Sequence, residues 1–545
     1  MSEQLDGRGA PREPLERDAD VLVLGGGPAG CWAAWSAARA GAKVVLAEKG
    51  YVGSSGATAS TGTGFWHLPP DEKLREAAVA EREALGGNLT ERRWMHRVLD
   101  QVYENLPLLD KWGYPFPIGP DGNVSRGTVQ GPDYMKAMRR AVREAGVTIL
   151  DQSPALELLA DAHGVGGAAG ISRLDNRYWK VRAGSVVLSA GGCAFLSKAL
   201  GCNTNTGDAG LMAAELGVEL SGMEFSSHYS FAYGPTSVTK GGFFFFATFT
   251  REDGSVIGGV DPRHSYPDIA AEMLKGPVYA CLDQAKLEWR ENMRGVMPNF
   301  FTPFKRVGID PFVDRFPVTL RCEGTVRGTG GIRIVSDDCG TTVPGLYAAG
   351  DSATRELVTG AFSGGGSHNA AWATSSGTWA GKAAAEHALS LGAAMHSRKL
   401  QGAGRNGIRP SGTARGSIDY ASVVQEVQNE VLPYDKNIFR TGERLSASLA
   451  RLDALWNTLG GEPPDDLRGI LRTREAAAMV ATARWMYESA LGRRESRGMH
   501  RRLDYPNADP AQTHRLITGG LDCVRVRPEH NGRSIPADVR EAVTA

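Results

Sequence analysis

The chain has 545 residues, too many for one ordinary hydrophobic core, so its length predicts about three domains or a large intertwined pair. Lys and Arg together number 61, as do Asp and Glu, so no net charge exists to attract nucleic acid or an anionic membrane. The seven cysteines stand singly, without a C-x-x-C pair for zinc or an iron–sulfur cluster, and fit a reducing cytoplasm. We therefore predict no metal site.

The first residues, 1–17, are polar, contain Pro and Gly, and lack the apolar core of a signal peptide. We expect a flexible tail there. The run "GGFFFFATF" (241–249) falls far short of the ~20 apolar residues that a membrane span needs. The sequence thus predicts a cytoplasmic protein with no integral membrane segment.

A βαβ unit of about thirty residues follows the tail. The run "DADVLVLGG" (18–26) predicts a strand buried on both faces, "PAGCWAAWSAARAGA" a helix, and "KVVLAEK" (43–49) the next strand. Gly25, Gly27 and Gly30 fill the G-x-G-x-x-G spacing, which needs glycine for a tight turn, for backbone approach to a pyrophosphate and for helix–strand packing. Glu48 ends the second strand, where a carboxylate accepts hydrogen bonds from ribose hydroxyls. This arrangement predicts a dinucleotide site.

Several later loops share this character. Residues 49–67 are small and hydroxylic, which suits a backbone folded over a flat ligand, although a flexible surface loop is the alternative. The runs "SVVLSAGG" (185–192), "TNTGDAGLMAAELG" (204–217), "GLYAAGDSA" (345–353) and "GGGSHNAAWATSSG" (364–377) repeat the pattern of glycine turns beside strands and helices. A single nucleotide accounts poorly for so many loops. FAD accounts for them well, because its adenosine half can lie at the first βαβ unit and its flavin half along distant segments.

Seven motifs in order resemble a known family: "VLVLGGGPAG", "SVVLSAGG", "TGDAGLMAAELGVELSGMEF", "GPVYACLD", "TGGIRI", "GLYAAGD" and "ESRGMHRRLDYP". They look like the flavoprotein family of succinate dehydrogenase, fumarate reductase, L-aspartate oxidase and the adenylylsulfate reductase α subunit. The resemblance implies an α/β fold with a Rossmann-like FAD/NAD(P)-binding domain in two segments, 18–221 and 326–395. It also implies an inserted α+β capping domain at 222–325 and a helical C-terminal region at 396–545, whose blocks 423–459 and 471–498 have amphipathic helical spacing.

The resemblance also assigns cofactor contacts. It implies that Asp351 lies at the ribityl chain and that Gly366 and Ser367 begin a helix whose positive end stabilises the reduced flavin at its pyrimidine edge. Together, motifs and resemblance predict these FAD contacts: Gly25, Gly27, Pro28, Ala29, Gly30, Glu48, Lys49, Ser55, Gly56, Thr58, Ser60, Gly62, Ala190, Gly191, Thr206, Asp208, Gly350, Asp351, Gly365, Gly366 and Ser367.

Four positions depart from the dicarboxylate enzymes of this family. Gly56 stands at about the place of the histidine that bonds covalently to FAD, so we expect non-covalent FAD. Val238, Val326 and Ser363 stand where those enzymes have an arginine proton donor, a substrate histidine and a carboxylate-clamping arginine. A dicarboxylate would lose its bidentate partners and its acid. We therefore expect a substrate other than succinate or fumarate.

Three residues are the catalytic candidates: His228, Arg327 and His368. His228 follows M-E-F, where the family has an active-site histidine. Arg327, with Arg321 and Lys240 as further candidates, could bind an anionic group, although exposed arginines usually only solvate a surface. His368 lies just inside the helix beside the flavin, and a capping or packing role is its alternative.

Two functions remain open at this point. The first is an FAD-dependent oxidoreductase that moves a hydride between flavin N5 and a small organic, anionic or partly apolar substrate, with His228 as acid–base or orienting group and Arg327 as anchor. The second is a flavoprotein subunit that exchanges electrons with a separate ferredoxin-like iron–sulfur partner, since "FSGGGSH" resembles the adenylylsulfate reductase α subunit. A non-catalytic FAD-binding regulator is a third, minor alternative.

Overall fold

The largest sheet in the computed structural model combines a parallel core with an antiparallel extension. The structure describes residues 12–118, 124, 126–239, 242–259, 266–392, 394–404, 419–459 and 466–529. Within them, the sheet has the order β16-β6-β7-β8-β1-β2-β5, with β15 paired to the end of β8. Its strands are β1 (Arg12–Leu24), β2 (Val44–Ala47), β5 (Thr148–Leu150), β6 (Ala155–Asp161), β7 (Gly164–Ser172), β8 (Arg177–Leu188), β15 (Leu346–Ala348) and β16 (Gln401–Gly402).

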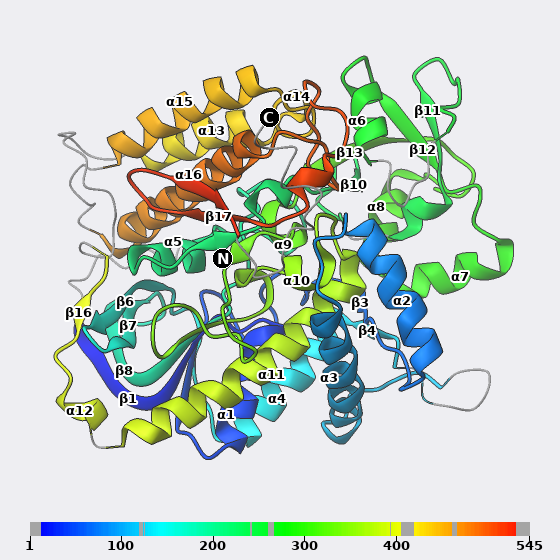
Figure 1. Cartoon of the computed structure of the whole chain (residues 1–545). Helices are drawn as coiled ribbons and strands as arrows, with labels where there is room; N and C mark the ends of the chain where they lie inside the picture. Colours follow the sequence, from blue (N-terminus) through cyan, green and yellow to red (C-terminus); the bar gives the residue numbers. More distant parts are fainter. Residues whose placement is uncertain are drawn as a thin grey trace.

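Strands β5, β2, β1, β8 and β15 run parallel and form the Rossmann-like part. Residues Val21–Leu24 of β1 are at most 2% exposed, as expected for a strand covered on both faces. Helices α1 (Pro28–Arg39), α4 (Gly131–Glu144) and α11 (Gly365–Leu391) lie together along one side of this sheet (Figure 1). The predicted α/β fold class is therefore confirmed.

The expected flexible tail is wrong for residues 12–17. These residues begin β1 and pair with β8, with Leu15 opposite Trp179 and Arg17 opposite Val181. Most side chains of this stretch are exposed, because the short strand β2 does not reach them. These residues are polar because their side chains face solvent. The backbone hydrogen bonds to β8 hold the stretch in the sheet, but backbone pairing cannot be recognised from the amino-acid composition.

A separate antiparallel sheet, in the order β10-β13-β12-β11, lies within the segment predicted as the capping domain. Its elements are β10 (Tyr229–Tyr233), η2 (Gly242–Phe246), β11 (Thr248–Arg251), α6 (Tyr266–Met273), β12 (Val278–Cys281), α7 (Leu287–Val296), α8 (Pro298–Val307) and β13 (Phe316–Cys322). Phenylalanines fill its core, among them Phe244 of the FFFF run, which packs on Phe231 and Phe249. The sheet stands to one side of the Rossmann-like part in Figure 1. The boundaries 222 and 325 stay predictions.

The C-terminal region contains the expected helices. They are α13 (Tyr420–Val431), α14 (Tyr434–Asn437), α15 (Gly442–Thr458) and α16 (Leu467–Gly492), and Figure 1 shows α13, α15 and α16 packed side by side. The region is not purely helical, however. Its strands β17 (Leu516–Gly519) and β18 (Arg525–Pro528) join β9 (Leu220–Ser221) and β14 (Gly331–Ile332) in a sheet of order β14-β9-β17-β18. This part of the chain is thus attached to both segments of the Rossmann-like domain.

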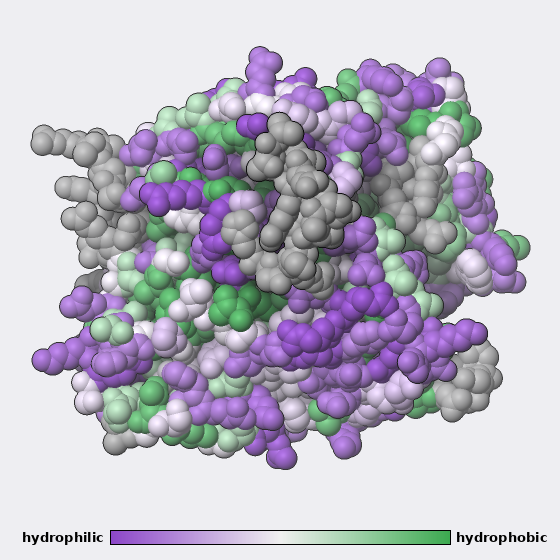
Figure 2. Space-filling model, in the orientation of Figure 1, coloured by the Kyte–Doolittle hydropathy of each residue, from purple (hydrophilic) through white to green (hydrophobic). Residues whose placement is uncertain are grey.

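The remaining elements connect these parts. They are β3 (Gly62–Gly64), β4 (Thr128–Gln130), α2 (Glu72–Leu85), α3 (Arg92–Lys111), α5 (Asp208–Glu215), η1 (Met223–Phe225), α9 (Gly324–Arg327), η3 (Gly350–Ser352), α10 (Glu356–Thr359), α12 (Ala394–Ser397) and η5 (Pro510–Gln512). Hydrophilic residues cover most of the face shown in Figure 2. Within the part of the chain that the structure describes, no helix is both long and apolar enough to span a bilayer.

The register of the parallel strands places their ends at one level. Leu24 at the end of β1 pairs with Ala47 of β2 and with Leu188 of β8, and Leu188 pairs with Ala348 of β15. The loops that follow these four strands therefore emerge at the same edge of the sheet. Ligands of open α/β sheets bind at this carboxyl edge.

Candidate functional site

The first of these loops has the geometry that the G-x-G-x-x-G spacing predicts. Gly25 has φ +104°, and a Cβ on Gly30 would lie 1.8 Å from the Gly25 carbonyl oxygen, so both positions require glycine. A Cβ on Gly27, by contrast, would meet nothing within 4 Å. The Gly26 N–H donates to Glu48 Oε2 (2.6 Å) and the Gly50 N–H to Glu48 Oε1 (2.7 Å). Glu48 therefore fixes the turn, and Gly27 leaves space beside the start of α1.

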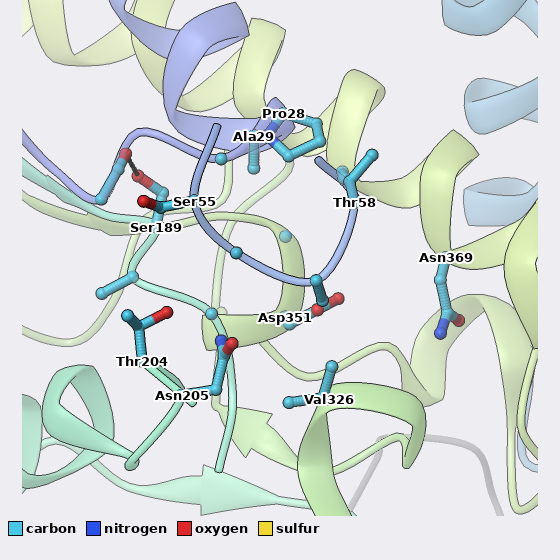
Figure 3. Close-up of a pocket in the computed structure, with 18 of the residues that line it drawn as sticks. Pro28, Ala29, Ser55, Thr58, Ser189, Thr204, Asn205, Val326, Asp351 and Asn369 are labelled. Carbon is cyan, nitrogen blue, oxygen red and sulfur yellow. Dashed lines mark hydrogen bonds between the residues drawn. The ribbon is translucent and has the colours of Figure 1, made fainter. Parts of the chain in front are cut away.

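That space belongs to a cavity that encloses about 1310 Å³ of empty space, its open mouth included. Figure 3 shows loops from several chain segments around it. The cavity brings together most of the predicted cofactor residues: Gly25, Gly27, Pro28, Ala29, Glu48, Lys49, Ser55, Gly56, Thr58, Gly62, Ala190, Gly191, Asp208, Gly350, Asp351, Gly365 and Gly366.

Four predicted cofactor residues do not line the cavity. Gly30 packs against Gly25 at the start of α1. Thr206 Oγ1 accepts a hydrogen bond from Lys49 Nζ (2.7 Å), and the Ser367 carbonyl accepts one from the Trp66 N–H (3.2 Å). The Ser60 carbonyl accepts one from the Asn299 amide of the capping segment (3.1 Å). Thr206 therefore contacts the lining residue Lys49, whereas these contacts of Ser367 and Ser60 are with residues that do not line the cavity.

The cavity also has lining residues that the sequence did not single out. They include Tyr134, Pro154, Ala155, Ser189, Thr204, Asn205, Met212, Asn369, Ala370 and Ala373. Thr204 and Asn205 stand beside the recognised Thr206 and could have been included. Nothing in the sequence marked Tyr134 as a cavity residue, because α4 has an ordinary amphipathic pattern. In the structure its ring is buried and its hydroxyl accepts a hydrogen bond from Trp32 Nε1 (2.9 Å).

A buried charge cluster forms part of the cavity wall. Lys49 Nζ lies 2.7 Å from Asp208 Oδ2 and 2.9 Å from Glu475 Oε1. Burial alone would lower the pKa of Lys49, but the two carboxylates outweigh it and raise the pKa above its ordinary value. Lys49 is therefore a permanent cation, and its charge is already compensated. Because Glu475 belongs to α16, the cluster also couples the C-terminal region to the cavity.

A second buried pair supports Asp351, the acid predicted at the ribityl chain. Asp351 forms an ion pair with Arg355, whose side chain is 1% exposed. Arg355 also donates to the carbonyl oxygens of Thr325 (3.0 Å) and Val326 (3.1 Å), and burial lowers its pKa. The Arg355 guanidinium therefore holds Asp351 and the short helix α9 in one arrangement.

Arg327 lies at the end of α9 and lines the cavity on the side of the capping segment. Its Nε lies 3.3 Å from Oε2 of Glu323, a carboxylate with no exposed surface. Glu323 also accepts hydrogen bonds from Ser230 Oγ (2.7 Å) and Thr239 Oγ1 (3.0 Å). Ser230 Oγ in turn lies 3.3 Å from His228 Nε2. His228 is not a lining residue, but this chain of polar contacts connects it to Arg327.

His368 lies differently. Its ring packs on Trp66 at 4.6 Å between centroids, and its Nδ1 lies 3.0 Å from the Gly364 carbonyl oxygen. Burial, with the nearby Arg82 cation, lowers the pKa of His368 to about 3, so the ring is neutral at physiological pH. It does not line the cavity. These observations favour the packing alternative for His368.

The departures from the dicarboxylate pattern also have definite places. Val326 lines the cavity, whereas Ser363 Oγ accepts a hydrogen bond from the Gly365 N–H (3.2 Å). Arg321 donates through Nε to the Thr236 carbonyl (2.9 Å) and does not line the cavity, which weakens its case as an anion anchor. Lys240 lies outside the described residues.

Comparison with known proteins matches two family models, an FAD binding domain over residues 20–256 and a fumarate reductase flavoprotein C-terminal domain over residues 429–518. The chain belongs to the fumarate reductase/succinate dehydrogenase flavoprotein family. It is an FAD-dependent oxidoreductase of that family.

Curated relatives extend over almost the whole chain. L-aspartate oxidase of Mycobacterium tuberculosis (strain H37Rv) is 28% identical and covers 93% of this chain and 97% of its own length. The fumarate reductase flavoprotein subunit of Escherichia coli (strain K12) is 26% identical over 89% and 88%. Two solved structures share the fold, quinol fumarate reductase of E. coli (22% identity, TM-score 0.80, 96% and 98% covered) and adenylylsulfate reductase of Archaeoglobus fulgidus (19%, TM-score 0.75, 95% and 96%).

The cavity residues fit FAD. The N-terminus of α1 offers its N–H groups and positive end beside the open space at Gly27, which suits a pyrophosphate. Helix α11 begins at Gly365 beside the same cavity, and Asn205, another lining residue, has a buried Oδ1 acceptor with no hydrogen-bond partner among the described residues. A long ligand with polar groups along its length would meet all three features.

Proposed function

We propose that this protein transfers a hydride between FAD and a small organic substrate that carries one anionic group and is neither succinate nor fumarate. The observation that carries the proposal is the charge balance of the cavity. Among the described residues that line it, the cations are Lys49 and Arg327. Lys49 is held between two carboxylates, Asp208 and Glu475, whereas the ion pair of Arg327 is with a single carboxylate, Glu323. A substrate with two carboxylates would bring two charges to a wall with one available guanidinium.

Each residue near Arg327 has a defined task in this proposal. The recorded ion pair uses Arg327 Nε, so its terminal amino groups are available for bidentate contact with one carboxylate. Glu323 holds the guanidinium in place. The role proposed for His228, which does not line the cavity, is to take up or release the substrate proton through its contacts with Ser230 and this pair. Flavin N5, when FAD is bound, supplies or accepts the hydride.

The test is anaerobic mixing of the yellow protein with a panel of small acids, amino acids and sulfur compounds, with flavin bleaching as the signal. We expect bleaching by a compound with one acidic group and none by succinate. The Arg327→Gln variant should need roughly tenfold or more of that compound for half-maximal rate, since a charge-assisted pair is worth about 1.5–3 kcal/mol. His228→Gln should slow bleaching at saturation by roughly 10²–10⁴-fold. Rapid bleaching by succinate would contradict the proposal.

We also propose that FAD is bound without a covalent bond to the protein. Gly56, at the cavity wall, has no side chain that could form one, and its φ of +89° disfavours any other residue there. Acid precipitation of the holoprotein should therefore release the yellow colour into the supernatant. Colour that stays with the pellet would refute this part of the proposal.

A second candidate function is electron transfer within a larger complex. One relative is a fumarate reductase flavoprotein subunit, and the fold is shared with adenylylsulfate reductase. In this alternative the electrons leave FAD for a ferredoxin-like iron–sulfur partner. Co-purification of such a protein in stoichiometric amount would favour the complex; fast reoxidation of the reduced protein by air alone would favour an enzyme that acts by itself.

A further inference from the structure

Asn369 is the one lining residue among those described whose side chain has both polar atoms buried and without any hydrogen-bond partner. The residue is 9% exposed. Leaving a buried amide donor or acceptor unsatisfied costs about 1–3 kcal/mol per group, so folded proteins rarely keep such groups without a ligand. Exchange of the amide nitrogen and oxygen would not alter the argument, because both atoms lack a partner.

The position of Asn369 on its helix restricts the kinds of ligand that could bind its amide. The residues of α11 that line the cavity are Gly365, Gly366, Asn369, Ala370 and Ala373, which form one face of its first turns. Apart from Asn369, these residues have no polar side chain. A flat ring lying on this face would therefore find one side-chain amide beside the helix N-terminus. Figure 3 shows Asn369 on the opposite side of the pocket from Ser189 and Thr204.

We propose that the side-chain amide of Asn369 binds the pyrimidine ring of the flavin, accepting from its N3–H and donating to a neighbouring carbonyl oxygen. The flavin imide presents a donor beside an acceptor, and a carboxamide is complementary to that pair, as amide side chains are to adenine. One bidentate contact would satisfy both unpartnered atoms. The inference rests on the proposal that FAD binds in this cavity. It identifies Asn369 as the residue that recognises the pyrimidine edge of the flavin.

Two other partners could form hydrogen bonds with the Asn369 amide instead of the flavin: a group of the substrate or a water molecule. Asn369 Oδ1 would lie 3.0 Å from a Cβ built on Gly364, so the amide is also near the loop that precedes α11. A substrate would leave FAD affinity independent of Asn369. A bound water would leave both FAD affinity and flavin potential independent of it.

The test compares FAD binding to apo-protein for wild type, Asn369→Leu, Asn369→Asp and the control Lys382→Ala, which alters an exposed position of the same helix. Leucine keeps the size but leaves the flavin imide unpaired, so we expect the Kd for FAD to rise roughly tenfold to hundredfold. The apo form of Asn369→Leu should be as stable as wild type or more so, because two unsatisfied buried groups are removed. If Asn369 had only a structural role, the substitution would not weaken FAD binding while leaving the apo-protein as stable as wild type.

Two further measurements keep the result interpretable. FAD methylated at flavin N3 should lose more affinity for wild type than for Asn369→Leu, since only wild type loses the N3–H contact. Asn369→Asp should lower the flavin midpoint potential, because its carboxylate opposes the negative charge of reduced flavin. A leucine variant that binds FAD within twofold of wild type overturns the inference while the proposed function stands. A wild-type protein that binds no FAD overturns both.

Discussion

Gly27→Ala separates the cofactor role of the first glycine turn from its structural role. Gly27 has φ −71° and ψ −173° at the N-cap of α1, a conformation that alanine adopts without strain, and the added Cβ would meet nothing within 4 Å. Alanine is a poorer N-cap than glycine by about 0.5–1 kcal/mol. It also lowers the conformational entropy of the unfolded chain, which stabilises the fold by about 0.4–1 kcal/mol. The apo-protein should therefore change in unfolding free energy by no more than about 0.5 kcal/mol.

FAD binding should respond quite differently. If the pyrophosphate approaches the backbone here, the new methyl group occupies the contact surface, and overpacking of about 1–3 kcal/mol raises the Kd for FAD roughly fivefold to hundredfold. The assay is urea unfolding of apo-protein with and without FAD, because stabilisation by a ligand depends on its concentration relative to Kd. Gly30→Ala is the matched control. Its Cβ would lie 1.8 Å from the Gly25 carbonyl oxygen, so the apo-protein itself should lose stability. A Gly27→Ala protein that binds FAD as wild type does would refute the placement of the pyrophosphate at this turn.

Two predictions concern the charges around the cavity. The pKa of His368 is lowered to about 3, so between about pH 6.5 and 3 the unfolded chain binds a proton at this residue that the folded chain does not. His368 should therefore reduce the stability of the fold as the pH falls through this range, by up to about 1.4 kcal/mol per pH unit. The difference in stability between wild type and His368→Gln should be constant above about pH 7 and should change below it, and a difference that stays constant at all pH values would contradict this. Lys49→Met removes the cation that pairs with the buried carboxylate of Asp208 and leaves Glu475 with Arg472 alone, and it should cost about 3–5 kcal/mol of unfolding free energy. Adding Glu475→Gln should restore part of that loss in the same urea titration, and no recovery would show that the three groups do not act together.

Much of the cofactor site follows from local sequence. The glycines of residues 25–30 and the acid Glu48 specify a turn, a helix start and a strand end within one short segment, which is why the sequence predicts them. The fold class follows in the same way from buried strands and helices in order. The polar start of β1 escaped prediction, because pairing with β8 uses backbone groups and leaves its side chains exposed.

Tertiary structure alone decided which side chains face the cavity. Glu323 had no distinguishing motif, yet its burial beside Arg327 sets the charge available to a substrate. His368 and Arg321 have the right chemistry in sequence, but the first packs on Trp66 and the second donates to a backbone carbonyl. Whether a polar atom is satisfied, and where a charge finds its partner, depends on neighbours from distant parts of the chain. Sequence spacing fixes the local backbone, whereas those neighbours exist only once the separate segments have packed.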